Sequence, residues 1–127
     1  MASKKSNYLK SKIVKHVKGE ASYTMPTTLY LALYTTDPTV ADTGTEVTGG
    51  SYSRKAISFA AESGGSAASN AAINFTSMPT TTAAFWGIRD AASGGNLLYF
   101  GNFDIAQAIT AGQTFTIASG NVVITEE

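Results

Sequence analysis

The 127-residue sequence contains no cysteine and only one histidine, His16. Without cysteine there is no disulfide framework and no thiolate metal site, which fits folding in a reducing compartment. No acidic residue or second histidine accompanies His16 at metal-ligand spacing, so we interpret it as a solvated side chain. The chain also lacks a phosphate-binding glycine loop, a serine elbow and a His-Glu-x-x-His pair. We therefore expect no metal, no cofactor and no enzymatic activity, although nine acidic residues leave paired-carboxylate chemistry open.

Long apolar runs are missing as well. No stretch approaches the roughly 18 to 20 residues of a membrane span, and no short apolar region with a cleavage site follows the first lysines. Charged residues make up 14% of the chain against 43% hydrophobic, and most of the remainder is Thr, Ser, Gly and Asn, which suits short strands joined by tight turns. We expect one soluble domain that does not contact a membrane.

Charge is distributed very unevenly along the chain. Residues 1–19 carry +6, and residues 20–127 carry nine carboxylates against three basic residues, or −6. The lysines of the first part solvate the face of a surface helix, dock on an acidic surface of another subunit, or touch nucleic acid. Nucleic acid is the least favoured partner, because the remainder of the chain is acidic. These lysines are Lys4, Lys5, Lys10, Lys12, Lys15 and Lys18.

The same segment has the signature of one short amphipathic helix. Ser6 is a suitable N-cap and Gly19 a suitable residue after the C-terminus, and Leu9, Ile13 and Val17 recur every four residues between them. We therefore divide the chain into a basic N-terminal helical arm, residues 1–19, and a β domain, residues 20–127.

Residues 28–38 predict the central strand of that domain. Their alternation places three leucines on one face, which we expect to be buried, and two tyrosines on the other. We expect the tyrosine face to be covered by another sheet or by a neighbouring subunit. The residues are Leu29, Leu31 and Leu33, and Tyr30 and Tyr34.

The rest of the chain predicts further short strands. Residues 39–50 read as a surface loop whose carboxylates, Asp42 and Glu46, are solvated. Residues 80–82 break the strand pattern, residues 105–109 form a bridge, and two hairpins turn at Gly-containing segments, 93–96 and 119–121. Strands are expected at 54–61, 72–75, 85–89, 97–103, 115–117 and 122–125. This spacing favours an antiparallel β-sandwich of jelly-roll or immunoglobulin-like type, with a small closed barrel as the alternative.

Aromatic residues suggest an interface. Trp86 is either a core residue or an interface anchor, and together with Tyr30 and Tyr34 it belongs to more aromatic surface than one small sandwich readily hides. We therefore expect a homo-oligomer or a protein that works docked on a larger assembly. The candidate partner-contact residues are the six lysines, Tyr30, Tyr34, Trp86 and Arg89.

Five segments resemble small structural proteins of tailed bacteriophages and prophages, which are usually labelled tail-fibre proteins. The resemblance rests on residues 6–9 (Ser-Asn-Tyr-Leu), 29–38 (Leu-Tyr-Leu-Ala-Leu-Tyr-Thr-Thr-Asp-Pro), 44–54, 69–75 and 90–99. It implies a non-enzymatic virion protein, made in the host cytoplasm, with other virion proteins as partners and no catalytic residues. The sequence departs from the family at residues 86–89, where relatives carry a more apolar segment, so it is open whether Arg89 makes a contact particular to this protein.

Two placements in a virion are compatible with this resemblance. A chain of 127 residues makes one compact domain plus an arm, without the shaft and trimerisation segment of a receptor-binding fibre. We therefore favour a capsid decoration (cement) protein that binds the assembled shell through the major capsid protein and stabilises it. The alternative is a tail, tail-fibre or baseplate component that binds tail proteins.

Overall fold

A computed structural model describes residues 3–126 of the chain. These residues form a mainly β fold with one short N-terminal helix, which confirms the predicted fold class. The elements are β1 (Ser3–Lys5), α1 (Asn7–Val17), β2 (Leu29–Tyr34), β3 (Lys55–Ile57), β4 (Ser66–Ala68), β5 (Ile73–Phe75), β6 (Thr81–Arg89), β7 (Leu97–Ile109), β8 (Phe115–Ile117) and β9 (Val123–Thr125).

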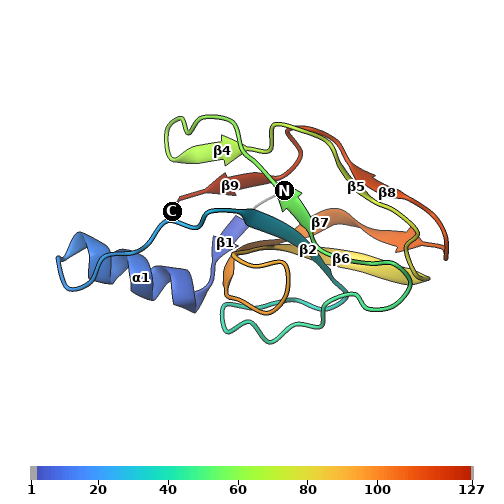
Figure 1. The fold of residues 1–127 in the computed structure, drawn as a ribbon, viewed down its shortest axis with the longest axis horizontal. Coiled ribbons are helices and arrows are strands. Elements are labelled where there is room, and N and C mark those ends of the chain that lie inside the picture. Colours follow the sequence, from blue (N-terminus) through green and yellow to red (C-terminus); the bar gives the residue numbers. More distant parts are fainter. Residues whose placement is uncertain (1–2, 127) are drawn as a thin grey trace.

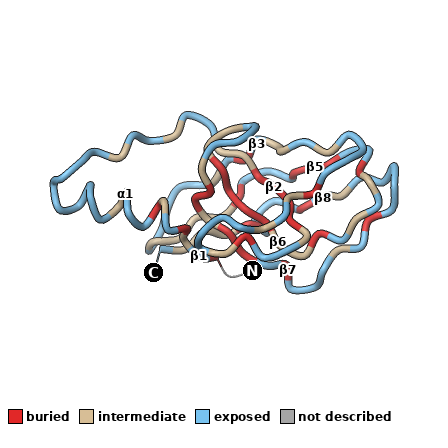
Figure 2. The backbone as a smooth tube through the Cα atoms, turned by 90° about the horizontal axis from the view of Figure 1, so that it is seen from below, coloured by how far each residue is buried: buried red, intermediate tan, exposed pale blue. Residues whose placement is uncertain are grey.

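The strands are arranged in a sandwich-like manner, with every pairing antiparallel. Five of them form a sheet in the order β1-β7-β6-β2-β3, and two two-stranded ribbons, β4–β9 and β5–β8, lie over it (Figure 1). The core fills the space between these layers, where Leu31 and Ile88 of the sheet meet Phe75 and Ile117 of the ribbons. Figure 2 shows the buried residues concentrated in this body of the molecule.

Strand β2 is buried on both faces, as its alternation predicts. Leu31 and Leu33 lie in the core, and Ala32 and Tyr34 on the opposite face are buried as well. Its predicted central position is wrong, because β6 occupies the centre between β7 and β2. Strand β6 runs nine residues and β7 thirteen, so this long hairpin, and not β2, forms the middle of the sheet.

Two breaks predicted in this hairpin are wrong, although the hairpin itself is confirmed. Thr81 pairs with Ile109 in the ladder, so residues 81–82 belong to β6 and residues 105–109 continue β7. Pairing instead lapses in the middle. Ala83 pairs with Gln107, and Phe85 pairs with Asn102. On β6 only Ala84 lies between these two pairs, whereas β7 has four residues there, 103–106, and these bulge out of the ladder.

The predicted C-terminal hairpin is also wrong. Strand β8 pairs with β5, and β9 pairs with β4, so the turn at residues 118–121 carries the chain from one ribbon to the other. Buried Ser69 holds this crossover, because its Oγ accepts hydrogen bonds from the backbone N–H groups of Gly120 and Val122, at 3.2 and 3.3 Å.

The start of the predicted arm is part of the sheet. Ser3–Lys5 pairs with β7, and Ser6 follows as the buried N-cap of α1. The Ser6 Oγ accepts from the Leu9 N–H at 3.2 Å and donates to the Leu97 carbonyl, which ties the helix N-terminus to β7. Residues 1, 2 and 127 lie outside the described residues, and the division of the chain after residue 19 stays a prediction.

Beyond its first turn, α1 leaves the body of the protein. Leu9 is its only buried residue, whereas Val17 of the predicted apolar face is 79% exposed and nearby Val14 is 60% exposed. The helix and the connector that returns to β2, residues 18–28, stand at one end of the molecule (Figures 1 and 2). We call residues 7–28 the α1 projection.

Candidate contact surfaces

Three of the predicted partner-contact residues lie inside the protein. Trp86 is 0% exposed and packs in the core cluster, and Tyr34 and Arg89 are buried at the opposite face of the sheet. These side chains therefore offer no surface to a partner, and for Trp86 the structure supports the core alternative over the interface anchor. The ring is enclosed because β6, its strand, is central in the sheet and covered by the ribbons.

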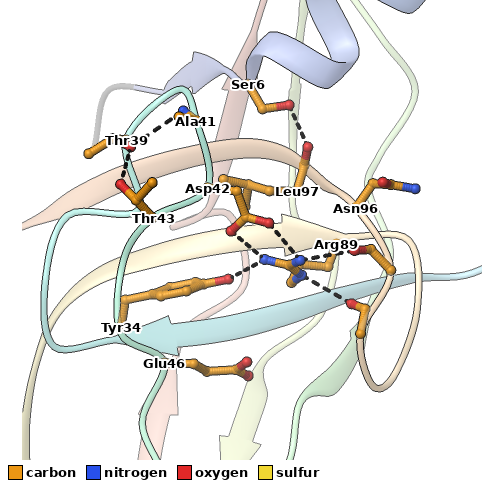
Figure 3. Close-up of polar contacts among 12 residues, drawn as sticks. Ser6, Tyr34, Thr39, Ala41, Asp42, Thr43, Glu46, Arg89, Asn96 and Leu97 are labelled. Atoms are coloured by element: carbon orange, nitrogen blue, oxygen red, sulfur yellow. Dashed lines mark hydrogen bonds and ion pairs between the residues drawn. The ribbon is translucent and has the colours of Figure 1, made fainter.

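Arg89 is at the centre of a polar cluster that braces two loops (Figure 3). Its Nη1 and Nη2 donate to the two carboxylate oxygens of Asp42, both at 2.8 Å. Nη1 also donates to the Tyr34 hydroxyl at 2.9 Å, and the guanidinium reaches the carbonyls of Gly94 and Gly95 at 3.3 and 3.1 Å. Loop 38–45 and turn 90–96 are thus held by one side chain.

Arg54 makes a second pair of the same kind. Its Nε and Nη2 donate to the Glu46 carboxylate at 2.9 and 2.8 Å, and its Nη1 donates to the carbonyls of Ala91 and Gly94 at 2.9 and 2.8 Å. Both arginines therefore donate to carbonyls of turn 90–96, and each pairs with a carboxylate in or directly after loop 38–45. We call Arg54, Arg89, Asp42 and Glu46 the arginine clasp.

Asp42 is exposed, as predicted, and Glu46 is half-buried, but neither carboxylate is held by water alone. Each carboxylate forms a bidentate ion pair with an arginine whose own side chain is nearly enclosed. The Tyr52 hydroxyl donates a further hydrogen bond to Glu46 at 2.7 Å and accepts one from the Leu33 N–H at 3.0 Å. The loop is therefore fastened to the sheet at these positions.

Burial and hydrogen bonding move the pKa values within the clasp. Burial by itself raises the pKa of Glu46, but hydrogen bonds from Arg54 and Tyr52 outweigh it and lower that pKa below its ordinary value. For Arg89, burial acts to lower the pKa, and the bonds to Asp42 and Tyr34 raise it instead. The Glu46 carboxylate and the Arg89 guanidinium therefore stay ionised across the neutral range.

The lowered pKa of Glu46 predicts an acid-dependent loss of stability. Because its folded pKa lies below its unfolded value, ordinarily 4.5, Glu46 contributes stability that is present above that pH and is lost as pH falls through the folded value. Glu46→Gln should therefore be less stable than wild type at pH 7, with the difference narrowing below about pH 4.5. Urea unfolding of both proteins from pH 7 to 3 measures this, and a constant difference would contradict it.

The predicted lysines are distributed over β1, α1 and the C-cap of α1. Lys4, Lys10 and Lys15 are exposed. Lys5 is bonded to Glu126, and Lys12 lies 5.5 Å above the ring of Tyr8. The Nζ of Lys18 lies 3.7 Å from the Oε2 of Glu20. Tyr30, the remaining candidate, is half-buried in β2. Contact of these residues with a partner stays a prediction.

The α1 projection contains three of the five large hydrophobic residues that are exposed among residues 3–126. Val14, Val17 and Met25 are all large and exposed, and Met25 is 82% exposed. The connector is held against the helix, because the Tyr23 N–H donates to His16 Nδ1 at 3.1 Å. The projection therefore presents apolar side chains and lysines together.

A cleft of about 470 Å³ lies between β7 and β8. Its lining includes Phe103, Ile105, Phe115 and Ile117, with Asp104 among the polar residues. Between residues 3 and 126 there is no group of three or more acidic or histidine side chains placed to hold a metal ion. Over the same residues, no helix has the length and apolar character needed to cross a membrane.

The fold and these contacts define a small, mainly β protein whose buried charges brace its own loops. A family model described as Podophage GP4 fiber I protein gp80 matches residues 4–125. The chain therefore belongs to this family of phage fibre proteins, and its resemblance to phage structural proteins is confirmed. No curated protein matches the chain. Of the two virion placements, the family supports the tail-fibre alternative and not capsid decoration.

Proposed function

We propose that this protein is a non-enzymatic structural component of a bacteriophage tail fibre. The observation that carries the proposal is the family match over residues 4–125, which includes α1 and almost the whole β domain. The arginine clasp fits a structural role, because its charged groups pair with one another and the arginines also donate to backbone carbonyls. These bonds hold the loops in place.

The α1 projection is the proposed contact with the rest of the assembly. Val14 and Val17 are one turn apart, so they lie on the same helix face. Burying a side chain of this kind contributes about 1.5–3 kcal/mol, and four lysines on α1 and its C-cap, Lys10, Lys12, Lys15 and Lys18, attract an acidic rim. The projection therefore suits a protein surface with an apolar centre and an acidic edge.

Localisation on virions tests the proposed function. We expect antibodies against this protein, imaged by immuno-gold electron microscopy, to label the tail fibres and to leave the capsid shell bare. Labelling spread over the capsid would support decoration and overturn the fibre placement. Absence of the protein from purified virions would overturn a structural role altogether. Antibodies against the major capsid protein provide the matched control for access to the shell.

A further inference from the structure

Exposed large hydrophobic residues are confined to very few places on the described chain. They are Val14, Val17, Met25, Val40 and Ile105. Three of them belong to the α1 projection, and Ile105, which is 76% exposed, belongs to the cleft between β7 and β8. A soluble protein that keeps two such features uncovered has two surfaces suited to burial against another molecule.

The cleft is suited to receive apolar side chains. Phe103 and Phe115 meet edge to face within it, with ring centroids 5.8 Å apart, and Ile117 adds to the same lining. Residues 103–106 bulge out of the β6–β7 ladder, which presents Ile105 outward. Strand β8 has β5 on one edge and no described strand on the other.

The charges of the two surfaces are complementary. Helix α1 carries Lys10, Lys12 and Lys15 and no acidic residue. The cleft lining contains Asp104 and no basic residue. The same relation holds for the whole chain, since residues 1–19 carry +6 and residues 20–127 carry −6. A second copy of the chain is therefore an electrostatically favourable partner for the projection.

The two surfaces cannot meet within one molecule. Helix α1 stands at one end of the longest axis, whereas β8, whose residues line the cleft, lies on the other side of the molecule (Figure 1). We propose that the α1 projection of one copy docks in the β7–β8 cleft of a second copy, with Val14 and Val17 against Ile105 and Phe115, and Lys15 near Asp104. This inference rests on the proposed function, because it names the partner of the same projection.

Such a contact is heterologous, because it joins different surfaces of the two copies. Each copy then retains one free projection or one free cleft, so the assembly closes into a ring or continues as a filament. Either form is larger than a single compact domain, as a component of a fibre needs to be.

Complementation between two variants tests the contact. Val17→Asp damages the projection and Ile105→Asp damages the cleft, because each places a charge in an apolar contact. We expect wild type to associate with rising concentration in light scattering, and each variant alone to associate at least about tenfold more weakly. An equimolar mixture should form a 1:1 complex and stop there, since it retains one intact projection and one intact cleft. Ala92→Asp, at an exposed site on neither surface, should associate like wild type.

A charge exchange adds a second test that a folding defect cannot imitate. Lys15→Glu and Asp104→Lys should each weaken association, and the double variant should recover it, with circular dichroism confirming that all remain folded. Loss of association in Val17→Asp but not in Ile105→Asp would show a helix-to-helix contact and overturn the inference. A wild type that stays monomeric overturns it too.

Virion occupancy separates this inference from the proposed function. If the purified wild type is monomeric while Val17→Asp is lost from virions, the projection binds another virion protein, and only the named partner is wrong. If Val17→Asp is present on virions at normal occupancy, the projection is not the assembly contact, and both this inference and that part of the proposed function fail.

Discussion

Replacing Trp86 with alanine should lower the free energy of unfolding by about 3–5 kcal/mol, the range for deleting a buried tryptophan or phenylalanine ring. Trp86 is 0% exposed in the central strand, and it lies in the core cluster between the sheet and the ribbons. Removing its ring leaves a cavity lined from both layers, and the paired backbone of β6 limits how far the surroundings can collapse into it.

Trp86→Phe is the matched control. The buried indole Nε1 has no hydrogen-bond partner among the described residues, so the native side chain carries an unsatisfied donor. Phenylalanine removes that donor and fills much of the space, and should therefore cost clearly less than alanine. Urea unfolding followed by circular dichroism measures both, because each substitution deletes the only tryptophan. Equal costs for the two variants would show that the ring volume is not what stabilises this site.

The local pattern of the sequence is enough to predict features that depend on residues close together in the chain, such as strand alternation and helix caps. The alternation of leucines and tyrosines predicts that β2 is covered on both faces, and Leu31 and Tyr34 are indeed buried. Ser6 and Gly19 predict the ends of α1 because capping is a local backbone property, and Ser6 is the N-cap while Gly19 has a φ of 80°. These features depend on neighbours a few residues away.

The sequence predicts the local β6–β7 hairpin, but it does not predict pairing between strands that are far apart in the chain. Ser66–Ala68 has no apolar alternation, and it becomes a strand only because Val123–Thr125 lies beside it. The Gly-containing turn at residues 118–121 has the composition of a hairpin, yet Ser69 holds it as a crossover. Propensity for a turn does not specify which strands follow it into one ladder.

The candidate site shows the same limit. Asp42 and Arg89 are 47 positions apart, and no spacing rule connects them, so a carboxylate in a Gly- and Thr-rich loop is interpreted as solvated. The apolar period of α1 predicts a face of Leu9, Ile13 and Val17, but it does not tell whether that face is covered within the chain. The structure buries Leu9 and leaves Val17 exposed, and the candidate contact therefore lies on the projection and not at the buried aromatic residues.

Asp42→Asn should lower the free energy of unfolding by about 2–3 kcal/mol. The substitution removes the negative charge from a guanidinium whose side chain is 9% exposed, and an unpaired buried charge is costly. The loss should fall below that of a fully buried pair, because the Asp42 side chain is itself 35% exposed. Asparagine isolates the charge, since Asp42 has a φ of 58° and asparagine tolerates that conformation, whereas alanine would add backbone strain.

Two comparisons make this prediction decisive. Asp104→Asn removes the same charge from an exposed carboxylate and, at a protein concentration at which light scattering shows only monomers, should change stability by less than about 0.5 kcal/mol. Combining Asp42→Asn with Arg89→Met should cost less than the sum of the two single variants, because the second change removes the charge that the first leaves unpaired. Urea midpoints of the four proteins and wild type at pH 7 test this. An Asp42→Asn protein as stable as Asp104→Asn would mean that the carboxylate is solvated after all and that loop 38–45 is held by its other contacts.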